Sequence, residues 1–352
     1  MIELSFEMQS EADILARLKT NLAADFNGQS SIEGTFNADM LTANAVEFEQ
    51  VYAEISLMVE AIFADTSWGE YLTKRAAEFG VVRKVAAAAI GTISLTGSAG
   101  SNIIQGSLFS TAQDIKFYTT EDATIGVDGT TIVAIECGVA GAIGNVEAGT
   151  IINIPYSIPG VISCTNAETT DGYNEETDAA LLERYLLKVR TPATSGNEYH
   201  YKEWALSVTG VGQAKVRSLW AGKGTVKVII IDSNSNTASD NLIGNVSNYI
   251  ESVRPIGATV TVTSPDPLAI DIMADITGVA DADTVKTAVN TYFKSIGFKA
   301  SCVSWTQIGK ILLDTGTITD YSNLNLNGTS ANVSISTEQL PTCGTVTLNV
   351  IS

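Results

Sequence analysis

Apolar residues recur every three or four positions through the first quarter of the chain, which is the spacing of amphipathic helices. A first helix is predicted over Glu11–Asp25. Its apolar face consists of Ile14, Leu15, Leu18 and Leu22. A Gly/Ser-rich break from Asn27 to Gly34 separates it from a longer helix, predicted from about Ala38 to Phe63.

The longer helix carries one continuous apolar face. The large residues on that face are Leu41, Phe48, Val51, Tyr52, Ile55, Met58, Val59 and Ile62. Covering such a face would contribute on the order of 12–24 kcal/mol as an upper bound, at about 1.5–3 kcal/mol for each large side chain. Two interpretations are open: the face packs within this chain, or it joins helices of other chains in an intermolecular bundle.

The pattern then changes from helix to strand. Ser67 and Glu70 have the spacing of a capping box, which predicts a third helix that Gly80 ends. Beyond it, Thr92, Ser94 and Thr96 alternate with Ile93 and Leu95. Thr131–Cys137 and Ile151–Ile154 are predicted as further strands, and frequent glycines separate these runs. This alternation is typical of strands joined by tight turns.

The second half mixes both kinds of element. Helices are predicted over Thr177–Val189, Glu198–Val208, Asp240–Val253, Asp283–Ile296 and Trp305–Leu313. Strands are predicted over Val211–Leu219, Thr225–Ile231, Thr259–Thr263 and Leu268–Ile276. The prolines at 265 and 267 suggest a linker. We expect a multidomain α+β protein with an N-terminal helical arm (1–89), a central β-rich domain (90–170) and two mixed α+β domains (171–264 and 265–352).

The segment from Arg190 to Val216 is dense in turn residues, aromatics and small residues, and it contains no cluster of reactive groups. Asn197 can cap the following helix, and Gly210 with Gly212 allows a sharp reversal of the backbone. Arg254 and Pro255 end a later helix. The residues expected to form this structural motif are Pro192, Gly196, Asn197, Trp204, Gly210, Gly212, Arg254, Pro255 and Gly257.

Composition excludes several classes of protein. The formal net charge is −19, with 39 acidic against 20 basic residues and no basic patch, so a nucleic-acid partner is not expected. Charged residues make up only 17%, which indicates surface buried against other chains, or alternatively a soluble protein rich in Ser, Thr and Asn. The N-terminus has no signal-peptide pattern and no apolar run reaches a membrane span, so we expect synthesis in the cytoplasm without membrane insertion.

Candidate chemistry is sparse. The four cysteines at 137, 164, 302 and 343 include no C-x-x-C pair, which favours buried free thiols over a zinc or redox site. His200 is the single histidine and has no second base nearby in sequence. The loop from Asp232 to Ile243 lacks the Gly and Glu of a calcium loop, and Gly222-Lys223-Gly224 lacks the Walker spacing. The acid pairs Glu121-Asp122 and Glu175-Glu176 are typical of a solvated surface. We therefore predict no catalytic, metal or cofactor site.

The residues from about 67 to 264 resemble the baseplate J-like proteins, which are wedge components of contractile phage tails and tail-like particles. The matching residues keep their order along the chain. They are EYLTKRAAEFG (70–80), Arg83, Gly91, GAIGNVEAG (141–149), IPGVISCTN (158–166), GYNEETD (172–178), the Arg-Thr-Pro segment at 190–192, Gly196-Asn197, Trp204-Ala205-Leu206, Gly210-Val211-Gly212, Ala214-Lys215-Val216, Gly224-Thr225-Val226 and Arg254-Pro255-Ile256-Gly257-Ala258. One departure is the turn Ile104-Gln105-Gly106-Ser107, where the family often has Pro-x-Gly-Thr.

This resemblance implies a structural role in a six-fold baseplate. The implied partners are a second wedge protein, a small lysozyme-like wedge protein, the hub and spike, sheath-proximal components and other copies of this chain. The apolar helix face would enter an intermolecular bundle, residues from about 171 onward would make ring contacts, and the assembly would help to trigger sheath contraction. The particle would be released from the bacterial cytoplasm by lysis. No catalytic residue and no cofactor is implied.

Two other classes of protein are open. The Gly/Thr-rich β region and the acid pairs would also suit a glycan-binding or glycan-cleaving tail protein. An autonomous extracellular adhesin is the second alternative, although it would be expected to carry a secretion signal.

Overall fold

The computed structural model describes residues 8–25 and 32–351, with the side chains of 24 and 25 left aside. The chain divides into two compact units. One unit consists of Met1–Arg83 with Thr177–Tyr185, and the other of Lys84–Glu176 with Leu186–Ser352. The first seven residues and most of the predicted break at 27–34 lie outside the described residues.

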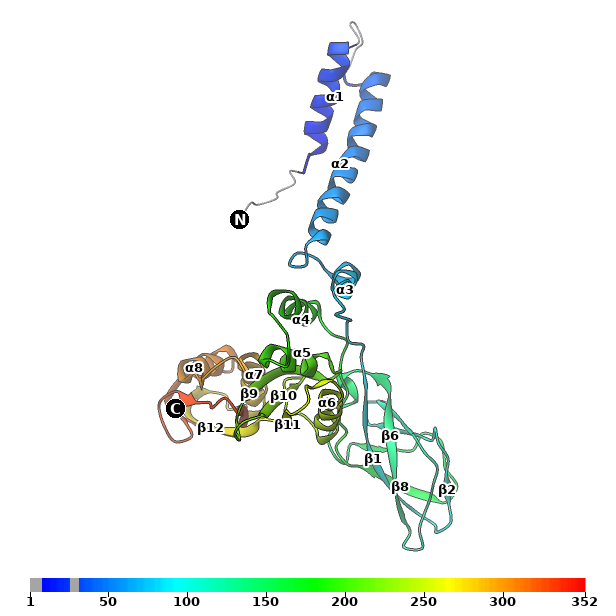
Figure 1. Cartoon of the computed structure of the whole chain (residues 1–352), viewed down its shortest axis with the longest axis vertical. Helices are drawn as coiled ribbons and strands as arrows, with labels where there is room; N and C mark the ends of the chain where they lie inside the picture. The colour runs from blue at the N-terminus through cyan, green and yellow to red at the C-terminus, as the bar shows by residue number, and fades with distance from the viewer. Residues whose placement is uncertain (1–7, 26–31, 352) are drawn as a thin grey trace. The chain divides into compact units, whose positions relative to one another are not determined.

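The first unit contains a helical hairpin (Figure 1). Helix α1 (Glu11–Asp25) runs antiparallel to α2 (Phe36–Ile62), and both follow the predicted periodicity closely. Ile14 of α1 is buried, whereas the buried residues of α2 are the small Ala38 and Ala45. Small side chains let the two helix backbones approach closely, so α1 covers part of α2 and leaves most of its large apolar residues exposed.

The predicted cap of the third helix is wrong. Helix α3 (Gly69–Ala77) begins after Trp68, and no side chain caps it from that position. The Ser67 hydroxyl is buried and has no hydrogen-bond partner among the described residues. The first backbone amide, on Gly69, instead donates to Asp178 Oδ2 at 2.9 Å. Asp178 is the first residue of α4 (Asp178–Arg190). The first amide of α3 therefore has an acceptor that is remote in sequence, in place of the expected local cap.

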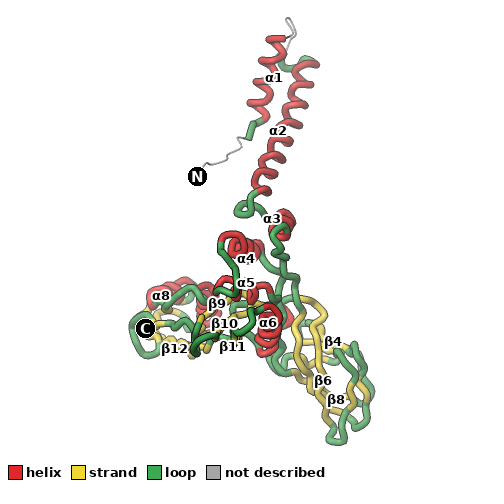
Figure 2. The backbone as a smooth tube through the Cα atoms, in the orientation of Figure 1, coloured by secondary structure: helices red, strands yellow, loops and turns green. Residues whose placement is uncertain are grey.

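The second unit opens with a six-stranded antiparallel sheet (Figure 2). Its order is β7-β3-β4-β6-β1-β8. These strands are β1 (Ala88–Gly97), β3 (Leu108–Thr111), β4 (Lys116–Thr119), β6 (Thr130–Ala140), β7 (Ile151–Asn153) and β8 (Val161–Asn166). Strands β2 (Asn102–Ile103) and β5 (Ala123–Thr124) form a separate pair, and a short 3-10 turn, η1, covers Ala142–Gly144. The inward-facing residues form one apolar core that includes Phe109 and Phe117.

A buried side chain links the two edge strands of this sheet, which has a near-barrel form. Asn166, at the end of β8, accepts the backbone amide of Ile151 in β7 at 2.8 Å. Its amide group also donates to the carbonyls of Glu147 and Ala167, at 3.0 and 2.6 Å. Because β7 and β8 form no regular ladder, these bonds supply partners that strand pairing would otherwise provide.

The next part is a three-stranded sheet of order β11-β10-β9. Strand β10 (Thr225–Asp232) pairs antiparallel with β9 (Val211–Ser218) and parallel with β11 (Thr259–Thr263). Helices α5 (Glu198–Ser207) and α6 (Asp240–Val253) pack on one face through a core that includes Trp204, Leu242 and Ile230. Crossover through α6 explains why β10 and β11 are parallel.

The last part is a sheet of order β14-β12-β16. It is built from β12 (Asp266–Gly278), β14 (Ile318–Leu326) and β16 (Gln339–Val350), with α7 (Ala282–Ile296) and α8 (Trp305–Asp314). Strands β13 (Cys302–Val303) and β15 (Val333–Ser334) form a separate pair. The predicted linker is wrong at Pro267, which lies inside β12 and pairs in register with Leu340 of β16. Proline is tolerated near the start of a strand, where one partner strand is missing.

Strand β10 connects the two mixed parts of this unit. Its residues Ile229 and Ile231 pack against Phe298 and Leu340, on the face opposite to the helices. Beside this contact Lys227 Nζ lies 2.6 Å from Glu338 Oε2, and Arg217 pairs with the same carboxylate. Strand β10 is therefore buried on both faces, which explains the continuous apolar run at 228–231.

The two glycines before β9 act in different ways. Gly210 has a φ of +94°, as the expected reversal requires. Gly212 does not turn the chain: it is the extra residue of a bulge, since Ile231 pairs with Gln213 and Asp232 with Val211. A Cβ on Gly212 would lie 2.3 Å from the carbonyl oxygen of Asp232, so this position needs glycine because the two backbones are close.

Replacing Gly212 tests this close approach. We expect Gly212→Ala to lower the free energy of unfolding by about 1–3 kcal/mol, because the added methyl group forces the bulge apart. Gly244→Ala is the matched control, since nothing lies within 4 Å of a Cβ added there inside α6. That control should raise stability by about 0.5–1 kcal/mol. Urea unfolding followed by circular dichroism measures both, and an unchanged midpoint for Gly212→Ala would contradict the bulge interpretation.

Candidate assembly interface

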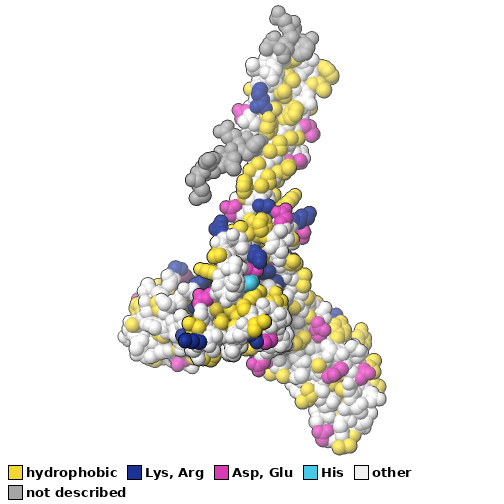
Figure 3. Space-filling view, viewed as in Figure 1, with side chains coloured by type: hydrophobic (Ala, Val, Ile, Leu, Met, Phe, Trp, Pro, Cys, Tyr) yellow, Lys and Arg dark blue, Asp and Glu magenta, His cyan; other side chains and the backbone are white. Residues whose placement is uncertain are grey.

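Helix α2 presents an exposed apolar seam. Phe48, Val51, Ile55, Met58 and Ile62 follow one another at steps of three, four, three and four residues, and all are exposed. This alternation is the pattern of the a and d positions of a coiled coil, which place one stripe of side chains toward a partner helix. Apolar side chains are visible along the length of α2 in the space-filling view (Figure 3).

The other residues predicted for this face are partly covered. Leu41, Tyr52 and Val59 are half-buried. The Tyr52 hydroxyl accepts a hydrogen bond from Arg17 Nη2 of α1 at 3.4 Å, and the guanidinium lies 6.0 Å from the ring centroid. Tyr52 therefore belongs to the contact within the hairpin, whereas the seam lies beside that contact. The intermolecular role of the whole set stays a prediction.

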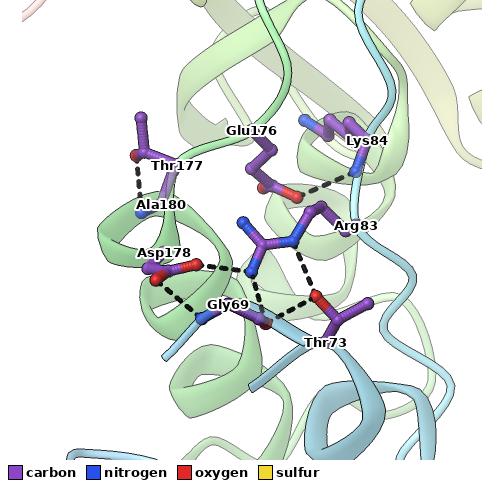
Figure 4. Close-up of polar contacts among 8 residues, drawn as sticks. All are labelled: Gly69, Thr73, Arg83, Lys84, Glu176, Thr177, Asp178 and Ala180. Atoms are coloured by element: carbon purple, nitrogen blue, oxygen red, sulfur yellow. Dashed lines mark hydrogen bonds and ion pairs between the residues drawn. The ribbon is translucent and has the colours of Figure 1, made fainter. Parts of the chain in front are cut away.

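Two sequence segments that resemble the family signature meet in the first unit (Figure 4). Arg83 Nη2 lies 2.5 Å from Asp178 Oδ1 and 3.1 Å from the carbonyl oxygen of Gly69. The Arg83 Nε group donates to the Thr73 hydroxyl at 2.8 Å. Backbone donation from Gly69 and the Arg83 guanidinium hold the pKa of Asp178 below its ordinary value of 3.8. The group fixes the start of α4 against the start of α3.

The residues next to this group are fixed inside the second unit (Figure 4). The backbone amide of Lys84 donates to Glu176 Oε2 at 3.1 Å, and the Lys84 ammonium donates to the carbonyl oxygen of Val211 at 2.9 Å. From the sequence, Glu176 was expected on a solvated surface. In the structure its carboxylate instead accepts a hydrogen bond from the backbone.

The aromatic and glycine-rich motif of the central part forms a compact structural site. Asn197 caps α5, as predicted, by accepting the amide of His200 at 3.0 Å, and it donates to the carbonyl oxygen of Pro192 at 2.6 Å. Gly196 has a φ of +73°, and a Cβ there would meet the ring of Pro255 at 2.6 Å. The turn that contains Gly196 and the Arg254–Ala258 turn are therefore in contact, although they are far apart in sequence.

The remaining motif residues support this contact. Trp204 is buried, with Tyr201 edge-on at 5.0 Å between ring centroids. The Arg254 guanidinium donates to the carbonyl oxygen of Ala258 at 2.5 Å and pairs with Glu251. Gly257 has a φ of +89° in the turn between them. The aromatic contact is thus internal to α5, and the bonds of Arg254 fix the turn that follows α6.

The candidate chemical groups are used in the same structural way. His200 Nδ1 accepts the amide of Gly196 at 3.3 Å, and its ring lies 4.0 Å from that of Trp204. Asp232 accepts the amide of Asn236 at 2.7 Å, and burial raises its pKa to about 6. Asp122 accepts the amide of Gln105 at 2.6 Å. Lys223 lies in the turn between β9 and β10.

The described residues offer few places for other chemistry. Within 8–25 and 32–351, no three His, Cys, Asp or Glu side chains gather in a way that could hold a metal ion. No helix in that part of the chain is long and apolar enough to span a membrane. The four cysteines are free, but only Cys137 and Cys164 are buried, so the expectation of burial is wrong for Cys302 and Cys343, which are half-buried.

Comparison with protein families identifies the class. The Baseplate J-like protein barrel domain matches residues 92–172, the Baseplate J-like central domain 193–264 and the Baseplate J-like protein C-terminal domain 270–349. The chain therefore belongs to the baseplate J-like family, and the likeness extends through the last domain, beyond the residues that carried it in the sequence.

Two sequence relatives agree with this assignment. The chain is 34% identical to the phage-like element PBSX protein XkdT of Bacillus subtilis, over 97% of this chain and 98% of that protein. It is 26% identical to the baseplate protein gp47 of Escherichia phage Mu, over 77% of each. A chain in the cryo-EM structure of the anti-feeding prophage baseplate aligns over 96% of this chain and 99% of its own length, with 11% identity and a TM-score of 0.42. This protein is a baseplate component of a phage or phage-like tail.

Sequence reasoning did not identify the roles of Asp178 and Asn166. Both lie within segments that resemble the family, but their partners are Gly69, Arg83 and Ile151, which are remote in sequence. A signal was present in retrospect, because a charged residue next to a predicted helix start is a candidate cap. The particular helix that it caps could not be read from spacing.

The Asp178 carboxylate should make stability depend on pH. A carboxyl whose folded pKa lies below its unfolded pKa stabilises the fold above the unfolded value, and this contribution is lost as pH falls through the folded pKa. We therefore expect the difference in melting temperature between wild type and Asp178→Asn to shrink as pH is lowered from about 6 to about 3. Asp65→Asn, at an exposed acid of the same unit, is the control. A difference that stays constant over this range would count against the pairing.

Proposed function

We propose that this chain is a wedge protein of a contractile-tail baseplate and acts without catalysis. The observation that carries the proposal is the exposed seam on α2, because a water-soluble helix does not keep such a stripe uncovered unless another chain covers it. Membership of the baseplate J-like family supports this role.

The seam would enter a bundle with helices of other wedge chains. The partners proposed are a second wedge protein, a small lysozyme-like wedge protein and other copies of this chain, arranged around the hub and spike below the sheath. In this proposal residues 1–89 form the arm for the bundle. The blocks at 90–170, 171–264 and 265–352 are stiff spacers and ring contacts that pass the signal for sheath contraction to their neighbours.

The proposed role includes a place in the cell. The chain would be made in the bacterial cytoplasm, assembled there with its partners, and released within the particle by lysis. The acids at 122 and 176 serve as backbone partners, which favours a structural role for them over the glycosidase alternative.

Charge placed in the seam tests the bundle. We expect a Val51→Asp plus Ile55→Asp variant to keep residues 84–352 folded but to fail to join other wedge chains, because two carboxylates would have to be buried in the bundle. Copurification of wedge proteins and electron microscopy of induced lysates measure assembly. Circular dichroism and limited proteolysis of the purified chain measure folding.

A variant on another side of α2 provides the control. Val46→Asp plus Leu57→Asp introduces the same charges at residues that are 47% and 52% exposed, compared with 46% and 37% for Val51 and Ile55, but outside the seam. Normal particles from the seam variant would refute the bundle. Equal loss of assembly in both variants would show that the seam is no more important for assembly than the other side of α2.

A further inference from the structure

Strand β9 has an open edge. It is the last strand of the sheet β11-β10-β9, so no strand among the described residues pairs with its outer side. Leu219 donates its amide to the carbonyl oxygen of Thr225, and the amide of Asp232 is directed to Asn236. In an antiparallel pair, successive residues point their N–H and C=O groups alternately toward the partner strand and away from it. Counted from these two hydrogen bonds, residues 213, 215 and 217 point theirs toward β10. The N–H and C=O groups of Ala214, Val216 and Ser218 therefore point outward.

A groove of about 370 Å³ follows this edge. Its lining includes both Val216, from the face that packs on the helices, and Lys215, from the opposite face, so it lies over the edge of the strand itself. Tyr199 and Lys202 of α5 form one wall, and Thr337 lies on the other side. An extended chain fits such a site, because one side is a row of unpaired backbone groups and the walls are side chains.

The groove is basic, although the chain as a whole carries a net charge of −19. Lys202, Lys215 and Arg217 line it together with the acid Glu198, and Arg217 is in addition paired with Glu338, which lies outside the lining. Lys202 makes no hydrogen bond or ion pair with any described residue, and the Lys215 ammonium lies 4.5 Å from the ring centroid of Phe298. Burial lowers the pKa of Lys215, so an incoming carboxylate would compensate a charge that is poorly solvated.

We propose that β9 accepts an extended acidic segment of a neighbouring protein chain as an added strand. Backbone bonds to Ala214, Val216 and Ser218 would supply affinity, and side chains would supply specificity. Residues of the added strand that lie beside Lys215 and Arg217 share their face, so acids are preferred at alternate positions. The intervening residues face Tyr199 and Lys202. This site is distinct from the α2 seam and does not depend on it.

Binding of a synthetic peptide to the full-length chain tests the site. The probe is a fluorescent Thr-Glu-Val-Glu-Ile-Glu-Val-Thr peptide, measured by fluorescence anisotropy at low ionic strength. One matched control replaces each Glu by Lys. A second control carries backbone N-methyl groups along both of its edges, so that neither edge can pair with a strand. We expect the first peptide to bind and both controls to bind at least about tenfold more weakly, because they lose charge pairing or strand pairing.

Protein variants and hydrogen exchange locate the bound peptide. Lys215→Glu should weaken binding by about 3–10-fold, whereas Lys286→Glu, an equal charge change on α7 outside the groove, should leave it unchanged. Peptide binding should slow hydrogen exchange at the amides of Ala214, Val216 and Ser218, and this readout needs no variant.

Several results would overturn the proposal. They are absence of binding at about 1 mM peptide, equal binding of the N-methylated peptide, and unchanged exchange at the β9 amides in the presence of bound peptide. Each of these outcomes concerns β9 alone, so the proposed bundle through α2 would be unaffected.

Discussion

Burial of β10 on both faces is the constraint on which the larger unit depends. One face carries Val228 and Ile230 into the core beneath α5 and α6, and the other carries Ile229 and Ile231 against Phe298 and Leu340. A strand in this position has no solvated side, so its sequence cannot alternate. The central and C-terminal parts share this strand as a common wall, which makes them one packed body. The charges around Glu338 lie at the margin of that contact.

Polar side chains connect segments that apolar packing alone would leave loosely joined. Asn166 bridges the ends of the six-stranded sheet, and Arg83 with Asp178 joins the starts of two helices. In each case a backbone amide without a regular partner receives a side-chain acceptor from far along the chain. The cost of leaving such a group buried and unpaired, about 1–3 kcal/mol, explains why these positions use polar residues.

Among the residues that the structure describes, two surface features have no partner within the chain. The seam on α2 leaves Phe48, Met58 and Ile62 exposed, and the edge of β9 leaves backbone groups unpaired. One is a hydrophobic surface and the other is a hydrogen-bonding surface lined by positive charge. In the proposed assembly the seam would supply attraction and the strand edge would supply register.

The sequence by itself determined the local elements and the family. Steps of three and four residues located α1 and α2, alternation located β12, and Asn197 was recognisable as a cap because a helix cap acts within one turn. Only the tertiary structure decided which residues meet across the chain. It replaced Ser67 by Asp178 as the partner of the α3 amide, made Gly212 a bulge and placed Pro267 inside a strand. It also divided the apolar face of α2 between α1 and solvent. The periodicity of a sequence shows on which face of its element a side chain lies. Which residue it contacts there depends on how segments distant in sequence pack together.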